Sequence, residues 1–181
     1  MIDVTPAEIP GVRRVHAAQQ ADLRGRFVKT LHEEVFSAHG IPTRYAEQYY
    51  SVSKNNVLRG LHFQTPPHDH HKLVTCIEGR VFDVVVDLRK DSPAYGQHQS
   101  FELDGGDGVF VPSGCAHGFY VRSDSATLLY NVTTVYAASH DAGIRWDSVG
   151  IPWPCERPIV SERDTRLPPF ASFVSPFRLA A

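Results

Sequence analysis

Three side chains with complementary acid–base properties define the chemistry that this sequence can support: His62, Lys72 and Tyr130. His62 lies in the alternating segment 57–63, and histidine is the side chain best suited to take up and return a proton near neutral pH. Lys72 begins an apolar segment and could stabilise an oxyanion in a water-poor pocket. Tyr130 could deliver a proton to carbon if its hydroxyl points into the same pocket. A base, a fixed cation and an acid together suit chemistry at a carbon next to a carbonyl, which needs no cofactor.

Each of these residues also has an ordinary structural interpretation. His62 could be a hydrogen-bonded histidine of a barrel, Lys72 a solvated strand end and Tyr130 a core residue. The alternation of side chains along a strand also places Arg59 and His62 on opposite faces, so that a bulge or twist is needed for both to serve one pocket. Asp164 lies far along the chain and is a surface loop residue unless it orients His62.

A second group of residues is typical of a metal site. The pattern Gly106-x5-Pro112-x-Gly114-x2-His117 is close to the second signature of the cupin barrel, and His68-Asp69-His70-His71 resembles the histidine pair of the first. With His62, these histidines could bind iron, manganese or zinc. A metal-binding cupin would place a glutamate four or five residues later, where this chain has Val74 and Thr75. We therefore expect no catalytic metal and keep a metal-dependent enzyme as an alternative.

Basic side chains form a third group, which could bind a phosphorylated substrate because arginine pairs well with phosphate. Its members are Arg24, Arg59 and Arg163, together with His117. Scattered arginines are usually surface residues, so this group alone predicts little.

The segment from about 44 to 136 consists of short apolar and β-branched runs separated by turn residues. This spacing favours an all-β sandwich or barrel over alternating strands and helices. Gly79 separates two such runs and predicts a hairpin between them. One helix is expected over 29–39, and the proline-rich segment 152–181 is expected to wrap irregularly over the barrel.

The composition indicates a single domain, 1–181. A net charge of −2, with both signs interspersed, gives no support for a nucleic-acid partner. The three cysteines are widely spaced and indicate reduced thiols in a cytoplasmic protein. We expect no signal peptide and no membrane segment, because the apolar runs are far shorter than the roughly 20 residues of a membrane span.

The ordered motifs of the chain resemble those of the dTDP-4-dehydrorhamnose 3,5-epimerase family, nucleotide-sugar epimerases with a cupin-type jelly-roll fold and no catalytic metal. The match covers most of the chain, from about Asp22 to Asp164. It rests on D-x-R-G at 22–25, V-L-R-G-L-H-F-Q at 57–64, K-L-V at 72–74, V-F-D-V-x-V-D-L-R at 81–89, S-P-x-Y-G at 92–96, P-x-G-x-A-H-G-F at 112–119, G-I-R-W at 143–146, I-x-W-P at 151–154 and S-x-R-D at 161–164.

The resemblance implies a role for each candidate residue. His62 would be the general base, paired with Asp164, and Tyr130 the general acid on the other face of a sugar ring. Lys72 would stabilise the oxygen of an enolate. The residues implied to hold the diphosphate or sugar, or to line the site, are Arg24, Lys29, Glu47, Ser51, Arg59, His117, Tyr136 and Arg163. No cofactor is implied, and family members are homodimers in which N-terminal elements of one subunit complete the pocket of the other.

The implied reaction is inversion at C3, C5 or both carbons of a nucleotide-linked 4-keto-6-deoxy sugar, most simply dTDP-4-dehydro-6-deoxyglucose, in deoxysugar biosynthesis. The C4 ketone acidifies the hydrogens on both neighbouring carbons. A base can therefore form an enolate, which an acid reprotonates from the opposite face.

The chain departs from the family pattern at nucleotide-facing positions. The usual D-x-R-G-x-F-x-E ends in Lys29, and the usual Q-x-N-x-S reads Glu47-Gln48-Tyr49-Tyr50-Ser51. The loop before Lys72 carries three histidines where the family has a glutamine and small residues. A single-centre epimerase, or one that acts on a GDP- or CDP-linked sugar, therefore stays open, as does a non-catalytic module that binds sugar nucleotides.

Overall fold

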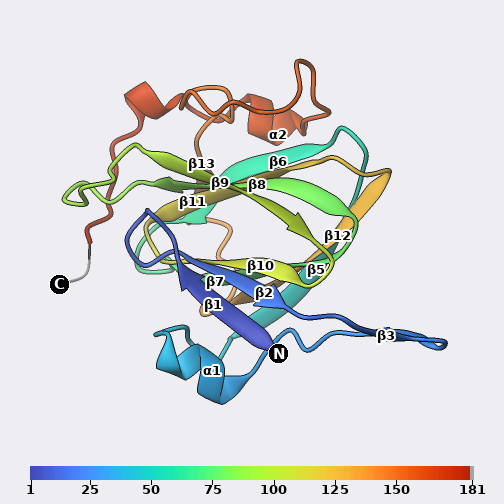
Figure 1. Ribbon diagram of the computed structural model, residues 1–181. Helices are drawn as coiled ribbons and strands as arrows, with labels where there is room; N and C mark the ends of the chain where they lie inside the picture. Colours follow the sequence, from blue (N-terminus) through green and yellow to red (C-terminus); the bar gives the residue numbers. More distant parts are fainter. Residues whose placement is uncertain (180–181) are drawn as a thin grey trace.

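Two antiparallel β-sheets face each other and form the body of the molecule in the computed structural model, which describes residues 1–179 (Figure 1). The six-stranded sheet consists, in spatial order, of β1 (Ile2–Pro6), β2 (Arg13–Ala17), β10 (Asp107–Val111), β7 (Lys72–Glu78), β12 (Ser125–Val132) and β5 (Glu47–Lys54). The five-stranded sheet consists of β13 (Asp141–Gly143), β6 (Leu58–Gln64), β11 (Cys115–Val121), β8 (Arg80–Asp87) and β9 (His98–Asp104). The predicted all-β jelly roll is confirmed.

The alternation of side chains along the strands sorts the apolar residues into three layers. Leu73 and Val74 are neighbours on β7 and point to opposite sides of their sheet. Val74 belongs to the layer inside the barrel, whereas Leu73 packs with Phe36 on the outside. The outer face of the five-stranded sheet carries a third layer, in which Phe63 packs with Phe177. Apolar layers thus fill the barrel and cover part of the outer face of each sheet, and polar side chains that point inward line a pocket.

The predicted hairpin around Gly79 is wrong, because β7 and β8 belong to different sheets. β7 pairs with β10 and β12, whereas β8 pairs with β9 and β11. Gly79 instead makes a tight crossing between the sheets with φ +83°, and a Cβ there would lie 2.1 Å from the carbonyl oxygen of Ser125. A glycine between two β-runs therefore signals a sharp reversal without specifying the sheet that the second run joins.

Helix is limited to short pieces. α1 (Glu33–Ala38) lies within the predicted segment 29–39 but has only six residues, and its buried Phe36 packs on the six-stranded sheet. The hairpin of β3 (Gln20–Asp22) and β4 (Gly25–Phe27) precedes α1 and projects away from the barrel (Figure 1). Over residues 1–179, the structure contains no helix with the length and apolar character needed to cross a membrane.

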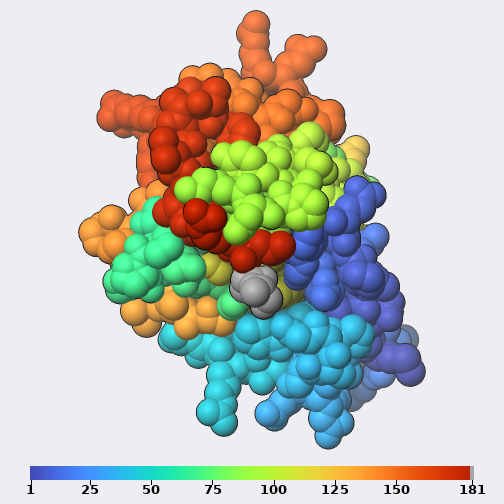
Figure 2. Space-filling model, turned by 90° about the vertical axis from the view of Figure 1, so that its left-hand side faces the viewer, coloured from blue at the N-terminus to red at the C-terminus, as the bar shows by residue number. Residues whose placement is uncertain are grey.

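The C-terminal segment wraps over the five-stranded sheet, as predicted for 152–181, although residues 180–181 lie outside the described part of the chain. It contains α2 (Glu162–Thr165) and the 3₁₀ helix η1 (Phe170–Ser172). Its end, dark red in Figure 2, lies against the loop after β8, where the N–H of Lys90 donates to the carbonyl oxygen of Phe177 at 3.2 Å. This wrap brings α2 into contact with β6.

Candidate active site

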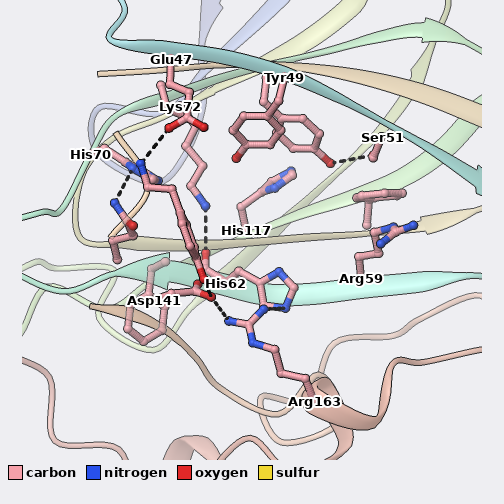
Figure 3. Close-up of a pocket in the computed structure, with 16 residues that line it drawn as sticks. Glu47, Tyr49, Ser51, Arg59, His62, His70, Lys72, His117, Asp141 and Arg163 are labelled. Atoms are coloured by element: carbon pink, nitrogen blue, oxygen red, sulfur yellow. Dashed lines mark hydrogen bonds and ion pairs between the residues drawn. The ribbon is translucent and has the colours of Figure 1, made fainter. Parts of the chain in front are cut away.

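A pocket of about 390 Å³ opens at one end of the barrel, between the inward faces of the two sheets (Figure 3). Nine of the predicted site residues line it: Glu47, Ser51, Arg59, His62, Lys72, His117, Tyr130, Tyr136 and Arg163. Most of them come from strands of both sheets, in which inward-pointing residues alternate with outward-pointing ones. The fold therefore brings together polar side chains that are up to 116 positions apart, as from Glu47 to Arg163.

His62 is held by Asp164 from outside the sheet. Its Nε2 lies 2.7 Å from Oδ1 of the Asp164 side chain, which is 3% exposed. Burial alone would raise the pKa of Asp164, but the hydrogen bond and charge of His62, the Gly60 N–H and the charge of Arg163 together lower it. An ionised carboxylate only accepts hydrogen bonds, so Nε2 carries a proton and Nδ1 is left as the basic nitrogen. The Ser161 hydroxyl, which accepts from the Asp164 N–H at 3.1 Å, fixes the start of α2.

A β-bulge places Arg59 and His62 in the same pocket. His62 pairs with His117, and Arg59 pairs with Phe119, so three steps along β6 correspond to two steps along β11. Gly60 lies in the bulge with φ +139°, and a Cβ there would lie 2.6 Å from the Cα of Gly118. The bulge that the sequence required for these two side chains is therefore present, and its close strand contact requires glycine.

Lys72 enters the same space from the start of β7. Lys72 is 8% exposed, and its Nζ donates to the carbonyl oxygen of His62 at 3.2 Å. Burial lowers the pKa of the Lys72 ammonium from 10.5 to about 8, an effect that Asp141 opposes and Arg163 reinforces. The ammonium stays protonated at neutral pH and can stabilise a negative charge that develops on a nearby oxygen.

Tyr130 occupies the wall opposite His62, since β12 and β6 belong to different sheets. Its hydroxyl lies 3.4 Å from the Ser51 hydroxyl on β5. Burial raises the pKa of the Tyr130 phenol, and the hydrogen bond from Ser51 opposes this only in part. The phenol therefore stays protonated at neutral pH and can donate a proton. A substrate between the two walls would meet a base on one side and an acid on the other.

His117 forms a second histidine–aspartate pair at the buried floor of the pocket. Its Nε2 lies 2.7 Å from Oδ2 of Asp83, and the side chains are 5% and 0% exposed. The His117 ring lies edge-on to Tyr130, with 6.3 Å between ring centroids. A group this deep can contact a sugar ring more readily than the diphosphate of an extended ligand.

Charged and polar side chains connect the rim of the pocket. The guanidinium of Arg163 pairs with Asp141 at 2.8 Å, and its other nitrogen lies 3.5 Å from Nε2 of His62. The Tyr136 hydroxyl donates to Asp141 at 3.3 Å, and the backbone N–H of Tyr136 donates to the Glu47 carboxylate at 2.7 Å. These contacts hold the exposed Arg163 at the mouth.

Arg24 and Lys29 do not lie at this pocket, although both were predicted site residues. Arg24 occupies the turn of the β3–β4 hairpin, where its exposed side chain pairs with Asp22 at 2.5 Å. Lys29 follows the hairpin and lines a separate hollow with Met1 and Phe27. Within one chain, the N-terminal part of the predicted site is therefore apart from the rest.

A family model described as dTDP-4-dehydrorhamnose 3,5-epimerase matches residues 6–172. The chain belongs to this family. Among its relatives, the dTDP-4-dehydrorhamnose 3,5-epimerase of Methanothermobacter thermautotrophicus is 41% identical over 155 residues, which are 82% of this chain and 83% of the relative. The dTDP-4-dehydrorhamnose 3-epimerase of Streptomyces niveus is 40% identical over 164 residues, which are 88% of this chain and 79% of the relative.

The fold of the epimerase family extends over nearly the whole chain. The crystal structure of dTDP-6-deoxy-D-glucose-3,5-epimerase from Legionella pneumophila, in complex with dTDP-4-keto-L-rhamnose, superposes with a TM-score of 0.92 at 30% identity. The alignment covers 99% of this chain and 100% of that one. The resemblance and the cupin-type jelly roll predicted from the motifs are confirmed.

The histidines before Lys72 do not gather as metal ligands in this family member. The ring of His68 is tilted against that of His140 with 4.6 Å between ring centroids, and Nδ1 of His71 accepts from the N–H of Ser113 at 3.1 Å. In the part of the chain that the structure describes, no three His, Cys, Asp or Glu side chains form a group able to hold a metal ion.

His70 differs from its neighbours because it lines the pocket. Its Nδ1 lies 3.2 Å from Nε2 of Gln64 and 3.3 Å from Oγ1 of Thr134, and with the Gln64 amide as the donor the ring proton is on Nε2. This Nε2 is buried and has no hydrogen-bond partner within residues 1–179. Burial lowers the pKa of His70 to about 3, helped by the charges of Lys72 and His71. A neutral imidazole nitrogen of a pocket-lining residue is therefore left without a hydrogen-bond partner.

Four polar pocket residues were missed from the sequence: Tyr49, Gln64, His70 and Asp141. The first three lie two positions from a predicted site residue, so strand alternation could have found them. Asp141 lies on the short β13, outside any alternating run, and offered no such signal.

Proposed function

We propose that the protein is a cofactor-independent epimerase that inverts C3 and C5 of dTDP-4-dehydro-6-deoxyglucose. The observation that carries the proposal is the placement of the His62–Asp164 pair and the protonated Tyr130 on opposite walls of one pocket, with Lys72 beside them. Binding alone does not require a base and an acid that face each other, so this arrangement favours an enzyme over a binding module.

The proposed chemistry is two proton transfers at each carbon. Nδ1 of His62 takes the hydrogen of C3 or C5 as a proton, and the electrons of the C–H bond form an enolate whose charge rests on the C4 oxygen. The Lys72 ammonium stabilises that oxygen. Tyr130 then gives its phenolic proton to the same carbon from the opposite face, which inverts the configuration. Solvent returns a proton to the phenolate and removes one from the imidazolium.

The remaining pocket residues are proposed to bind the ligand. Arg59 and Arg163 are cations near the mouth and suit the diphosphate. Glu47, Ser51 and Tyr136 line the walls next to them. The deeper His117 and the unpaired N–H of His70 suit the hydroxyl and keto oxygens of the sugar.

A homodimer is proposed to complete the site. Arg24 lies on a hairpin that projects from the barrel, and Lys29 follows it, so neither contributes to the pocket of its own chain (Figure 1). A projecting hairpin with an exposed cation can instead reach the diphosphate end of a neighbouring subunit's pocket. The family motif D-x-R-G at this turn supports the same assignment.

The cytoplasm is the proposed location. Its support is that Cys76, Cys115 and Cys155 are all free thiols, two of them buried. Free thiols are typical of a reducing compartment.

Inversion at C3 alone is a second candidate reaction. The Streptomyces niveus relative, at 40% identity, is a 3-epimerase by name, and the relative from Methanothermobacter thermautotrophicus, at 41%, is a 3,5-epimerase. Overall similarity therefore does not separate the two outcomes. The names of both relatives specify a dTDP-linked sugar, which favours thymidine over guanosine or cytidine in the substrate.

Proton NMR of dTDP-4-dehydro-6-deoxyglucose, incubated with the protein in deuterated water, tests the proposal. Deuterium at C3 and C5 of an inverted product is expected, and deuterium at C3 alone would identify the single-centre reaction. A His62→Ala protein should incorporate none. The proposal is wrong if the unmodified protein exchanges no hydrogen at either carbon, or if the His62→Ala protein keeps full turnover.

A further inference from the structure

Tyr49 and Tyr130 form a stacked pair in the wall of the pocket. They are directly opposite each other in the register of β5 and β12, so their side chains point to the same face of the sheet. Their ring centroids are 4.9 Å apart, and the ring planes differ by 16°. Figure 3 shows Tyr49 reaching into the pocket from the strand that carries Ser51.

The stack limits movement of the Tyr130 ring toward the open pocket. The hydroxyl of Tyr130 has one long hydrogen bond, 3.4 Å to Ser51, and the ring of His117 meets it only edge-on. Tyr49 is 42% exposed and lies toward the mouth, whereas Tyr130 is 8% exposed. The rest of the Tyr130 ring packs in the barrel core, so Tyr49 is the aromatic side chain that covers the face turned toward the mouth.

We propose that Tyr49 is a positioning residue that holds the phenol of Tyr130 at the face where carbon is reprotonated. This inference rests on the proposed function and adds a residue to it. Misplacement of a reacting group by about 1 Å can cost as much as about a hundredfold in rate. Loss of the stack should therefore slow proton delivery by Tyr130 without changing proton removal by His62.

The two proton transfers can be measured separately in deuterated water. After His62 removes a proton, that proton exchanges with solvent. Return of a deuteron by His62 gives labelled substrate with its original configuration. Delivery by Tyr130 gives labelled product with inverted configuration. The ratio of inversion to exchange with retention thus reports the Tyr130 step alone, and a general loss of folded protein does not change it.

Three variants test the proposal. Tyr49→Leu removes the ring, and its ratio of inversion to retained exchange is expected to fall about tenfold, with total exchange within about twofold of the unmodified protein. Tyr49→Phe keeps the ring and loses the hydroxyl, and its ratio should stay within about twofold. Tyr50→Leu is the matched control, because Tyr50 is the next residue, points to the other face and is 69% exposed.

The outcomes separate this inference from the proposed function. An unchanged ratio in Tyr49→Leu overturns the positioning role while exchange by the unmodified protein still supports an epimerase. An equal fall in Tyr49→Phe and Tyr49→Leu also overturns it, because the hydroxyl would then act directly. Absence of exchange in the unmodified protein, by contrast, is a failure of the proposed function itself.

Discussion

The imidazole Nε2 of His62 lies 2.7 Å from Oδ1 of Asp164, although 102 positions separate the two residues. Asp164 reaches the ring from α2, in the segment that wraps over the five-stranded sheet. The carboxylate also accepts the N–H of Gly60 at 3.3 Å, so it is held in place on two sides. The wrap around the barrel therefore sets the tautomer of a side chain inside it.

Asp164→Asn should lower the rate of hydrogen exchange by about 10²–10⁴-fold, the usual contribution of a general base. An asparagine cannot stabilise the imidazolium, and its amide N–H can turn Nε2 into the acceptor, which leaves the proton on Nδ1. Exchange is measured by NMR in deuterated water. Glu162→Gln on the exposed face of the same helix is the control and should be unaffected. A rate within about twofold of the unmodified protein would contradict the assigned role of Asp164.

The rate of epimerisation should fall as the pH rises through about 8, where the Lys72 ammonium of the free protein loses its proton. The direction follows from burial, which lowers this pKa from 10.5, so the stabilising charge is present below pH 8 and lost above it. The descending limb should appear in kcat/KM.

The charge of Asp141 provides a check on the assignment of this limb. Asp141 raises the pKa of Lys72, so Asp141→Asn should move the limb to lower pH. A profile of kcat/KM that stays level from about pH 7 to 10 would show that Lys72 does not govern the rate.

Gly60→Ala should destabilise the fold by about 2–6 kcal/mol, since it combines left-handed backbone strain with overpacking. Its φ is +139°, and the added Cβ would lie 2.6 Å from the Cα of Gly118 on the paired strand. Urea unfolding measures the change in midpoint. Gly150→Ala is the matched control, because its φ is +74° and nothing lies within 4 Å of the added Cβ. Equal costs for the two substitutions would mean that the close contact of β6 with β11 contributes nothing.

His70→Leu should raise KM about tenfold with little change in kcat, because the variant lacks the unpaired imidazole nitrogen of this pocket-lining residue. His70→Gln supplies an amide N–H in a similar place and should restore most of the affinity. The comparison requires initial rates over a range of substrate concentrations. An unchanged KM in His70→Leu would mean that the ligand does not use this donor.

The sequence predicted the pocket residues that follow strand alternation and could not predict the departures from it. His62, Lys72 and Tyr130 face inward as their segments indicate. Arg59 joins them only because β6 bulges against β11, and that register depends on pairing between segments far apart in the chain. The same limit applies to Gly79. The sequence correctly predicted a chain reversal at this glycine, but the sheet that β8 joins depends on strand pairing across the whole barrel.

Family motifs predicted which residues matter without separating chemistry from structure. In V-F-D-V-x-V-D-L-R, Asp83 supports His117 in the pocket, whereas Asp87 forms a buried pair with Arg89 at 2.7 Å and accepts from the Ser92 hydroxyl at 2.6 Å. Both aspartates occupy the same motif and the same strand. Their roles are distinguished only by the side chains that they contact in the folded protein, His117 for Asp83 and Arg89 for Asp87.

Arg24 provides the test of a shared site, because it is distant from the pocket of its own chain and exposed on the β3–β4 hairpin. If the hairpin completes the partner's pocket, Arg24→Ala and His62→Ala should each be inactive as homodimers. A heterodimer of the two places both defects in one pocket and leaves the other intact. Co-expression should therefore restore about a quarter of the normal activity, since about half of the dimers are mixed and each has one working site.

The matched control combines His62→Ala with Asp164→Asn. These two residues belong to the same pocket of the same chain, at 2.7 Å, so every site of their heterodimer carries one defect and no activity should return. Differently tagged chains, purified in succession, isolate the heterodimer and show that it has formed. An isolated Arg24→Ala and His62→Ala heterodimer without activity would mean that Arg24 serves the pocket of its own chain or none. If activity returns in the Arg24→Ala and His62→Ala heterodimer and not in the control heterodimer, the hairpin of one subunit and the base of the other must act in one site.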